Sequence, residues 1–180
     1  PSWNYSENNF LNYKCEDLIK YLINKNFHVI FRPHPEHFKR STKILLDIKK
    51  KFLNSSLFKF DDDKDNFTSM DKSFILITDN SGISIEYLMI YKKPTIYFDG
   101  FSKIHNSDYK FLNLELFEEK IKRKFGYIYL DKELLGFDKK IKAACDQFEF
   151  KKEELDDFIN KNIFNFCSSA ANIYYEFKDD

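Results

Sequence analysis

Short apolar runs alternate with longer amphipathic stretches along this chain, and that alternation limits the folds it can adopt. The short runs are rich in β-branched and aromatic residues, which favour strands. In the longer stretches apolar residues recur every three or four positions, as on one face of a helix. Strands that alternate with helices at this spacing predict parallel β-α-β units. Right-handed crossovers then give an α/β fold with a doubly wound, Rossmann-like parallel sheet.

The predicted elements follow one another without a repeat or a low-complexity linker, so we expect residues 1–180 to form a single domain. Strands are predicted at Phe27–Arg32, Leu57–Phe60, Ser73–Thr78, Thr95–Phe98 and Tyr127–Leu130. Helices are predicted at Glu16–Asn26, Glu36–Phe52, Asn66–Asp71, Ile83–Tyr91 and Leu114–Phe125. A loop is expected over 100–113, and two or three amphipathic helices over 131–177.

Two of these elements should be deeply buried, and one expected element is missing. The strand Ser73–Thr78 is almost entirely apolar, as when helices cover both faces of a sheet. The helix Ile83–Tyr91 is apolar almost all round. The first predicted helix has no strand before it except the stretch Pro1–Tyr5. We therefore expect the chain to be a fragment cut close to its first strand.

Composition and charge exclude several classes of protein. Lys+Arg and Asp+Glu both number 29, so the chain lacks the basic excess of a nucleic-acid binder, and no nucleic-acid partner is expected. The cysteines Cys15, Cys145 and Cys167 are scattered and form no C-x-x-C pair, which fits the reducing cytosol. No apolar stretch approaches the roughly 20 residues of a membrane span. We expect a cytoplasmic protein, with peripheral docking on a membrane left open.

The first candidate site is the loop that directly follows the strand Phe27–Arg32. Ligands of an open parallel sheet bind at the carboxyl ends of its strands, where Arg32 and His34 should lie. Arginine offers a planar fork of donors for phosphate, and histidine can act as general base or phosphate donor. Pro33 and Pro35 stiffen the turn. The alternative is a rigid surface turn with a solvated histidine.

The second candidate site is the tight turn Asp79, Asn80, Ser81 and Gly82, which leads into a helix. Backbone N–H groups at a helix N-terminus attract anions, Ser81 adds a hydroxyl, and Gly82 permits close approach of a phosphate. The alternative is simple capping of the helix by Asp79 or Ser81. Glu86, one turn further on, could bind a ribose hydroxyl or pair with Arg32.

Other polar residues are weaker candidates. We expect His28 to be structural, His37 to lie on the surface of an early helix turn, and His105 to lie in a loop. Asp61–Asp63 should form a solvated strand end, since no ligands at metal spacing surround it. No metal and no cofactor are expected. The chain has no G-x-G-x-x-G, P-loop or G-x-S-x-G motif, which removes the usual dinucleotide, NTPase and hydrolase functions.

Segments at both candidate loops resemble a known family. Phe27–Pro35, Ile77–Glu86 and Lys93–Phe98 occur in the order, and on the predicted elements, of the carboxyl-terminal domain of the CDP-glycerol glycerophosphotransferases. Pro1–Trp3 is similar to the end of that family's first strand. The family builds teichoic-acid-like polymers, and the resemblance covers about residues 1–100.

The resemblance implies one half of a glycosyltransferase-B fold, in which two Rossmann-like domains face each other and the carboxyl-terminal one binds the nucleotide donor. His34 matches the family's essential histidine and would be catalytic. Substrate binding would fall to Arg32, Asp79, Asn80, Ser81, Gly82 and Glu86. The chain departs from the family's Asp-x-Ser-Ser run at Gly82, which stands in place of the second serine and leaves the donor's identity open.

The expected activity is transfer of a glycerol-phosphate or related polyol-phosphate from a CDP-activated donor to a cell-surface polymer. The polymer or lipid-linked acceptor would bind an amino-terminal domain that this chain lacks, at the inner face of a bacterial membrane. Two alternatives stay open. One is a nucleotide-sugar glycosyltransferase or epimerase-like protein of the same fold, and the other is a non-catalytic interaction domain.

Overall fold

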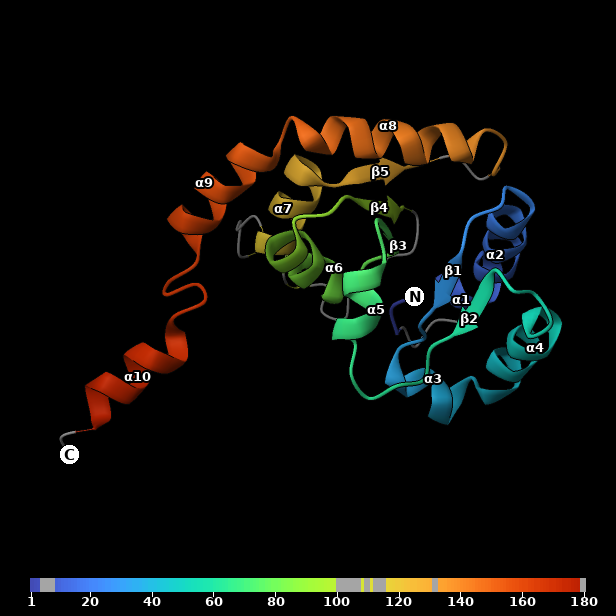
Figure 1. Cartoon of the computed structure of the whole chain (residues 1–180), viewed down its shortest axis with the longest axis horizontal. Coiled ribbons are helices and arrows are strands. Elements are labelled where there is room, and N and C mark those ends of the chain that lie inside the picture. The colour runs from blue at the N-terminus through green and yellow to red at the C-terminus, as the bar shows by residue number, and fades with distance from the viewer. Residues whose placement is uncertain (4–8, 100–107, 109–110, 112–115, 131–132, 179–180) are drawn as a thin grey trace.

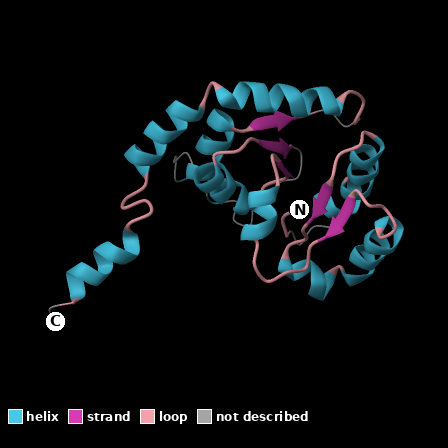
Figure 2. Ribbon diagram, viewed as in Figure 1, coloured by secondary structure: helices cyan, strands magenta, loops and turns pink. Residues whose placement is uncertain are grey.

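The computed structural model describes residues 1–3, 9–99, 108, 111, 116–130 and 133–178, and it is an α/β structure with parallel strands (Figures 1 and 2). The described strands form two small sheets. They are β1 (Val29–Phe31) beside β2 (Phe58–Phe60), and β3 (Leu76–Thr78), β4 (Thr95–Phe98) and β5 (Tyr127–Tyr129) in that order. Every pairing is parallel, so the predicted class of fold is confirmed.

The two sheets are not joined by strand pairing among the described residues, since β1 pairs with β2 and β3 pairs with β4. A single doubly wound sheet therefore stays a prediction. Each strand lies within a predicted strand or matches it, because the apolar runs are bounded by residues that end strands. The described strands are three residues shorter than predicted at β1 and β3, which border the space between the sheets, and one residue shorter at β2 and β5.

The first half of the chain forms short helices around β1 and β2. They are α1 (Phe10–Tyr13), α2 (Cys15–Asn24), α3 (Pro35–Arg40) and α4 (Thr42–Phe52). The prediction of one continuous helix over 36–52 was wrong, because the chain breaks at Ser41. Ser41 has φ −126° and ψ 28°, which departs from helical values and separates α3 from α4.

The helices after β2 cover the second sheet. They are α5 (Phe67–Lys72), α6 (Ile83–Glu86), the π-helix η1 (Tyr87–Tyr91) and α7 (Phe117–Phe125). The predicted helix 83–91 is thus one run that widens into a π-turn after Glu86 and ends at Lys92, which is left-handed with φ 49°. Tyr87 and Leu88 are fully buried, as the apolar sequence predicts. The predicted loop 100–113 lies almost entirely outside the described residues.

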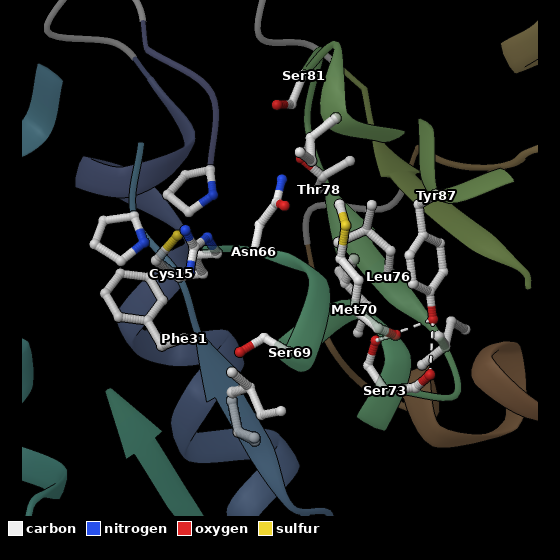
Figure 3. Close-up of a pocket in the computed structure, with 18 of the residues that line it drawn as sticks. Cys15, Phe31, Asn66, Ser69, Met70, Ser73, Leu76, Thr78, Ser81 and Tyr87 are labelled. Carbon is white, nitrogen blue, oxygen red and sulfur yellow. Dashed lines mark hydrogen bonds between the residues drawn. The ribbon is translucent and has the colours of Figure 1, made fainter. Parts of the chain in front are cut away.

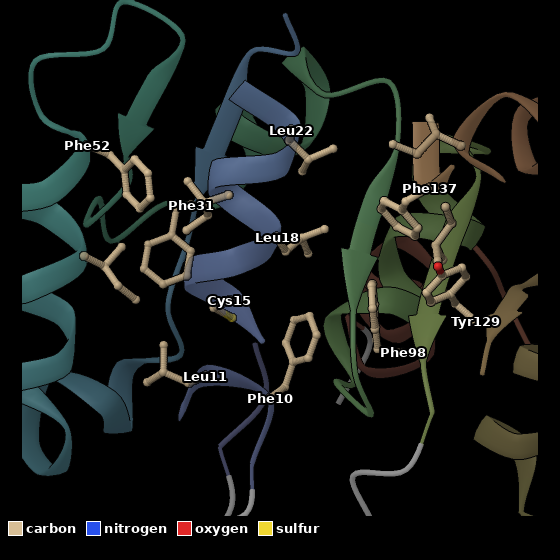
Figure 4. Close-up of a cluster of buried hydrophobic side chains, with 14 of the residues drawn as sticks. Phe10, Leu11, Cys15, Leu18, Leu22, Phe31, Phe52, Phe98, Tyr129 and Phe137 are labelled. Carbon is tan, nitrogen blue, oxygen red and sulfur yellow. The ribbon is translucent and has the colours of Figure 1, made fainter. Parts of the chain in front are cut away.

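A shared hydrophobic core joins the two sheets through the helices (Figure 4). Phe10 packs on Phe98 of β4 with ring centroids 5.1 Å apart, and Phe98 in turn packs on Phe137 of α8 (Phe137–Glu149) at 5.3 Å. Tyr21 of α2 adds a hydrogen bond of 2.6 Å to Asp138. Side-chain packing therefore holds the sheets together.

The carboxyl-terminal helices differ in how far they pack. α8 lies over the second sheet, and α9 (Lys152–Asn162) buries Leu155, Phe158 and Ile159. α10 (Ser169–Phe177) buries no residue and extends away from the body (Figure 1). Three amphipathic helices thus occupy the last part of the chain, within the predicted number.

A glycine substitution tests the close packing of α7 on β4. A Cβ at Gly126 would clash with the buried ring of Tyr97 and lie 2.7 Å from the Lys122 carbonyl oxygen. Gly126→Ala should therefore lower the free energy of unfolding by about 1–3 kcal/mol, measured by urea denaturation. Gly82→Ala is the matched control, because its Cβ would meet no atom within 4 Å, and it should change stability by less than about 0.5 kcal/mol. Equal effects of the two variants would contradict this packing.

Candidate functional site

A cavity of about 860 Å³ lies between the two sheets and contains most of the predicted site residues (Figure 3). It has two parts. The strand gap is the apolar part between β1 and β3, bordered by residues 27–31 and 74–78. The polar end is formed by residues that follow the carboxyl ends of β1, β2 and β3, and it consists of Arg32, His34, Lys64, Asn66, Ser81, Gly82 and Glu86.

His34 lies at the polar end because the two prolines beside it direct the chain from β1 into α3. It is the N-cap of α3 in extended backbone geometry, with Pro35 at the first helical position. Its Nδ1 accepts a hydrogen bond of 3.1 Å from the Glu36 N–H. A neutral imidazole that accepts at Nδ1 carries its proton on Nε2. In this tautomer the Nε2 of His34 is a hydrogen-bond donor.

Arg32 is held by the loop after β2. Its guanidinium donates to the Asp61 carboxylate at 2.7 Å and to the carbonyl oxygens of Asp63 at 2.7 Å and Asp65 at 3.1 Å. Asp61 also accepts a hydrogen bond of 2.5 Å from Ser69. These bonds fix the loop that carries Lys64 at the polar end. Of the two alternatives for Glu86, pairing with Arg32 is not observed, because Arg32 pairs with Asp61.

Burial alone would raise the pKa of Asp61, but the hydrogen bonds from Ser69 and Arg32 outweigh it and hold that pKa below its usual value. The prediction of a solvated strand end was right for Asp62 and Asp63, which are exposed, and wrong for Asp61, which is 1% exposed. A run of three acidic residues does not reveal that the first one faces an arginine 29 residues earlier in the chain.

The turn after β3 divides its residues between structural and cavity positions. Asp79 is buried and accepts hydrogen bonds of 2.6 Å from both the backbone N–H and the hydroxyl of Ser2. Asn80 accepts a hydrogen bond of 2.8 Å from Lys122 of α7. Ser81 and Gly82 line the cavity. The turn is therefore anchored at its first two residues and presents the next two.

Five of the seven predicted site residues line one cavity, and two do not. Those that line it are Arg32, His34, Ser81, Gly82 and Glu86, whereas Asp79 and Asn80 face other parts of the protein. Glu86 is exposed where it borders the cavity. Gly82 has φ −57°, a value open to any residue, so its glycine leaves space beside the cavity and relieves no backbone strain.

The other three histidines differ in where they lie. His37 was predicted on the surface, which is wrong: it is 0% exposed, and its Nε2 donates to the Ser2 carbonyl oxygen at 3.0 Å. Burial lowers the pKa of His37, which keeps the ring neutral. His28 is exposed just before β1, and His105 lies outside the described residues.

Sequence reasoning missed Lys64, Asn66 and Ser69, which reach the cavity from the loop after β2 and from α5. The sequence could have indicated them, because the residues that follow every parallel strand gather at the same edge of the sheet. It also missed Ser2 as the partner of Asp79. Burial raises the pKa of Cys15, another cavity-lining residue, to about 12, so this thiol is unreactive at neutral pH.

The described residues contain no cluster of three or more histidine, cysteine or carboxylate groups that could hold a metal ion. In the same part of the chain no helix has the length and apolar character needed to cross a bilayer.

Comparisons with protein-family models, curated proteins and solved structures gave no match to this chain. The resemblance to the CDP-glycerol glycerophosphotransferases therefore stays a prediction from the sequence motifs.

Removing the Arg32 side chain tests its role in holding the loop after β2. Arg32→Ala removes the hydrogen-bonded cation of the buried Asp61 carboxylate and leaves only Lys59, at 3.9 Å, so it should lower the free energy of unfolding by about 2–3 kcal/mol in urea denaturation. Arg123→Ala is the matched control, because Arg123 pairs with Glu119 on the surface, and it should change stability by less than about 1 kcal/mol. A loss no larger for Arg32→Ala than for the control would mean that the pair with Asp61 is unimportant.

The buried His37 predicts a pH-dependent stability. Its pKa is lower in the folded protein than the usual 6.5, so the unfolded chain binds the proton more readily. Stability should therefore fall as the pH drops below 6.5, with a slope of at most about 1.4 kcal/mol per pH unit. His37→Gln retains a donor for Ser2 but does not titrate, so its stability should vary less between pH 7 and pH 5. His28→Gln, at an exposed histidine, should keep the wild-type slope, and a flat wild-type profile would disagree with this account.

Proposed function

We propose that this chain is the nucleotide-binding domain of a transferase that moves a glycerol-phosphate or related polyol-phosphate from a CDP-activated donor to a polymer acceptor. One observation carries the proposal: the loop after β1 and the loop after β3 line the same cavity. In open α/β sheets ligands bind outside the carboxyl ends of the strands, where the order of the strands reverses. The loops that resemble the transferase family are the ones that meet there.

The charges at the polar end support an anionic ligand. The whole chain has a net charge of zero, yet Arg32 and Lys64 face the cavity there with Glu86 as the carboxylate. Arg32 is already bound to Asp61, so its part would be to hold the loop of Lys64 in place. Lys64 would then approach a phosphate as a point charge.

His34 has a defined part in this proposal. Its Nδ1 accepts from the Glu36 N–H, so in the neutral ring Nε2 carries the proton. That donor suits a phosphate oxygen, and it favours stabilisation of the leaving phosphate over removal of a proton from the acceptor. The Ser84 and Ile85 N–H groups donate to the carbonyl oxygens of Ser81 and Gly82, so the Ser81 hydroxyl and the N–H groups of Gly82 and Ile83 would contact the same pyrophosphate. Such chemistry consists of positioning and charge stabilisation.

The finer description of the fold belongs to the same proposal. A doubly wound, Rossmann-like sheet would place the polar end at the point where chain connections diverge to either side. The family resemblance adds a second domain with the acceptor site and a position at the inner face of a bacterial membrane. Those features are proposals for a longer protein, and the test below depends only on the residues of this chain.

Calorimetric titration with CDP, UDP, CDP-glycerol and CDP-ribitol tests the proposal. We expect the CDP compounds to bind. His34→Ala and Ser81→Ala should each weaken binding about tenfold or more, because each removes a hydrogen bond to a charged phosphate.

Two controls accompany these variants. His28→Ala removes a histidine from the opposite end of β1, and Ser56→Ala removes an exposed serine away from the cavity; both should bind as the unmodified chain does. If no nucleotide binds to the folded protein, the proposal fails. Preference for UDP-sugars would instead support the nucleotide-sugar glycosyltransferase alternative.

A further inference from the structure

The strand gap separates two strands that each lack a neighbour on one edge. β1 pairs with β2, and β3 pairs with β4, but in the described part of the chain neither has a partner on the side that faces the cavity. Figure 3 shows Phe31 on one side of this space and Leu76 and Thr78 on the other. A strand inside a parallel sheet has a hydrogen-bonded neighbour on both edges. Two unpaired strand edges that face each other across a cavity are therefore unusual.

The backbone of both strands directs hydrogen-bonding groups into the gap. The Val29 N–H donates to Leu57 at 2.7 Å, and the Phe31 carbonyl accepts from Asp61 at 2.9 Å, so these two residues face β2. Successive residues of a strand point their backbone groups to opposite sides, and Ile30 therefore faces the gap. By the same alternation Ile77 faces the gap, because the Leu76 N–H donates to Pro94 of the neighbouring strand segment at 3.1 Å.

Helices from both halves of the fold line the gap. Leu18, Ile19 and Leu22 come from α2, while Met70 comes from α5 and Tyr87 from η1. A layer between two sets of helices suits a strand that is apolar on both faces. The burial of the strands is consistent with an unfilled position beside β3. All four residues of β4 are buried, whereas Ile75 and Leu76, which border the gap, are only half-buried.

The ends of the gap set the direction of whatever fills it. At the amino ends of β1 and β3, Phe27 and Phe74 stack with ring centroids 6.3 Å apart. At the carboxyl ends, Ser2 is bonded to Asp79, and Pro1 lines the cavity itself. A segment joined to the amino end of Pro1 would therefore enter the gap with its own carboxyl end beside those of β1 and β3.

We propose that the strand gap is a binding site for one apolar β-strand, joined directly to Pro1 and running parallel to β1 and β3. Its backbone would pair with Ile30 on one side and Ile77 on the other, at the usual strand spacing of about 4.8 Å. The strand order would become β2-β1-new-β3-β4-β5, which is the doubly wound order with the new strand at the point of reversal. The polar end would remain open above it.

This inference does not depend on nucleotide binding, because the apolar gap, and not the polar end, carries it. The test extends the whole chain at Pro1 by Val-Ile-Val-Ile-Val behind a short charged leader, and compares it with Gly-Ser-Gly-Ser-Gly behind the same leader. Five residues span roughly 16 Å, about the length of the gap's border on β1. Amide hydrogen exchange and thermal unfolding are measured without any ligand.

We expect the apolar extension to slow exchange of the Ile30 and Ile77 amides at least about tenfold relative to Ile96, which lies in the central strand β4. The midpoint of thermal unfolding should rise by about 5 °C or more. In a series of two, four, five and seven apolar residues, both effects should increase up to about five residues and then level off. The protein should stay monomeric.

Three results would overturn the proposal. One is protection with Gly-Ser-Gly-Ser-Gly that equals protection with the apolar extension. Another is an undiminished effect from Val-Ile-Pro-Ile-Val, because a central proline cannot donate to the ladder. The third is protection that develops only as dimers form, which would assign the gap to a second copy of the chain. Failure here would leave the nucleotide titration unaffected, so the two proposals can be separated.

Discussion

Ser2 links the two halves of the cavity through three hydrogen bonds. Its N–H and hydroxyl donate to Asp79 after β3, at 2.6 Å each, and its carbonyl accepts from His37 of α3 at 3.0 Å. Asp79 and His37 are both buried, so these bonds form where water does not compete. The loops after β1 and β3 are therefore held beside each other by the start of the chain, although no strand pairing joins their sheets in the described part of the chain.

This bridge explains why the candidate site is assembled from residues that lie far apart in sequence. Asp79 and His37 serve as anchors, and their neighbours Ser81 and His34 are left to line the cavity. Arg32 has a similar anchoring role toward the loop after β2, through Asp61. In each loop one charged or polar residue forms structural hydrogen bonds and another faces the cavity. Such an arrangement lets a rigid scaffold present polar groups to a ligand.

Much of the fold could be predicted because its strands are short apolar runs with clear limits. The strand Thr95–Phe98 was predicted at its observed bounds, and it is the strand that lies between two others and is buried throughout. Helix limits were harder to predict. The break at Ser41 and the widening of the helix after Glu86 leave no mark in the hydrophobic pattern of the sequence. The meeting of Arg32, His34 and Ser81 at one cavity follows from the rule that parallel strands end together.

The sequence by itself determined the alternation of strands and helices, their parallel direction and the edge at which the candidate residues gather, because these depend on local pattern and on the handedness of the chain. Only the tertiary structure decided which polar residues face the cavity. Asp79 and Asn80 stand next to Ser81 in sequence but bind Ser2 and Lys122, and Asp61 is buried where its neighbours are exposed. The physical reason is that a polar side chain's role depends on the partner it meets across the fold, and no local pattern records that partner.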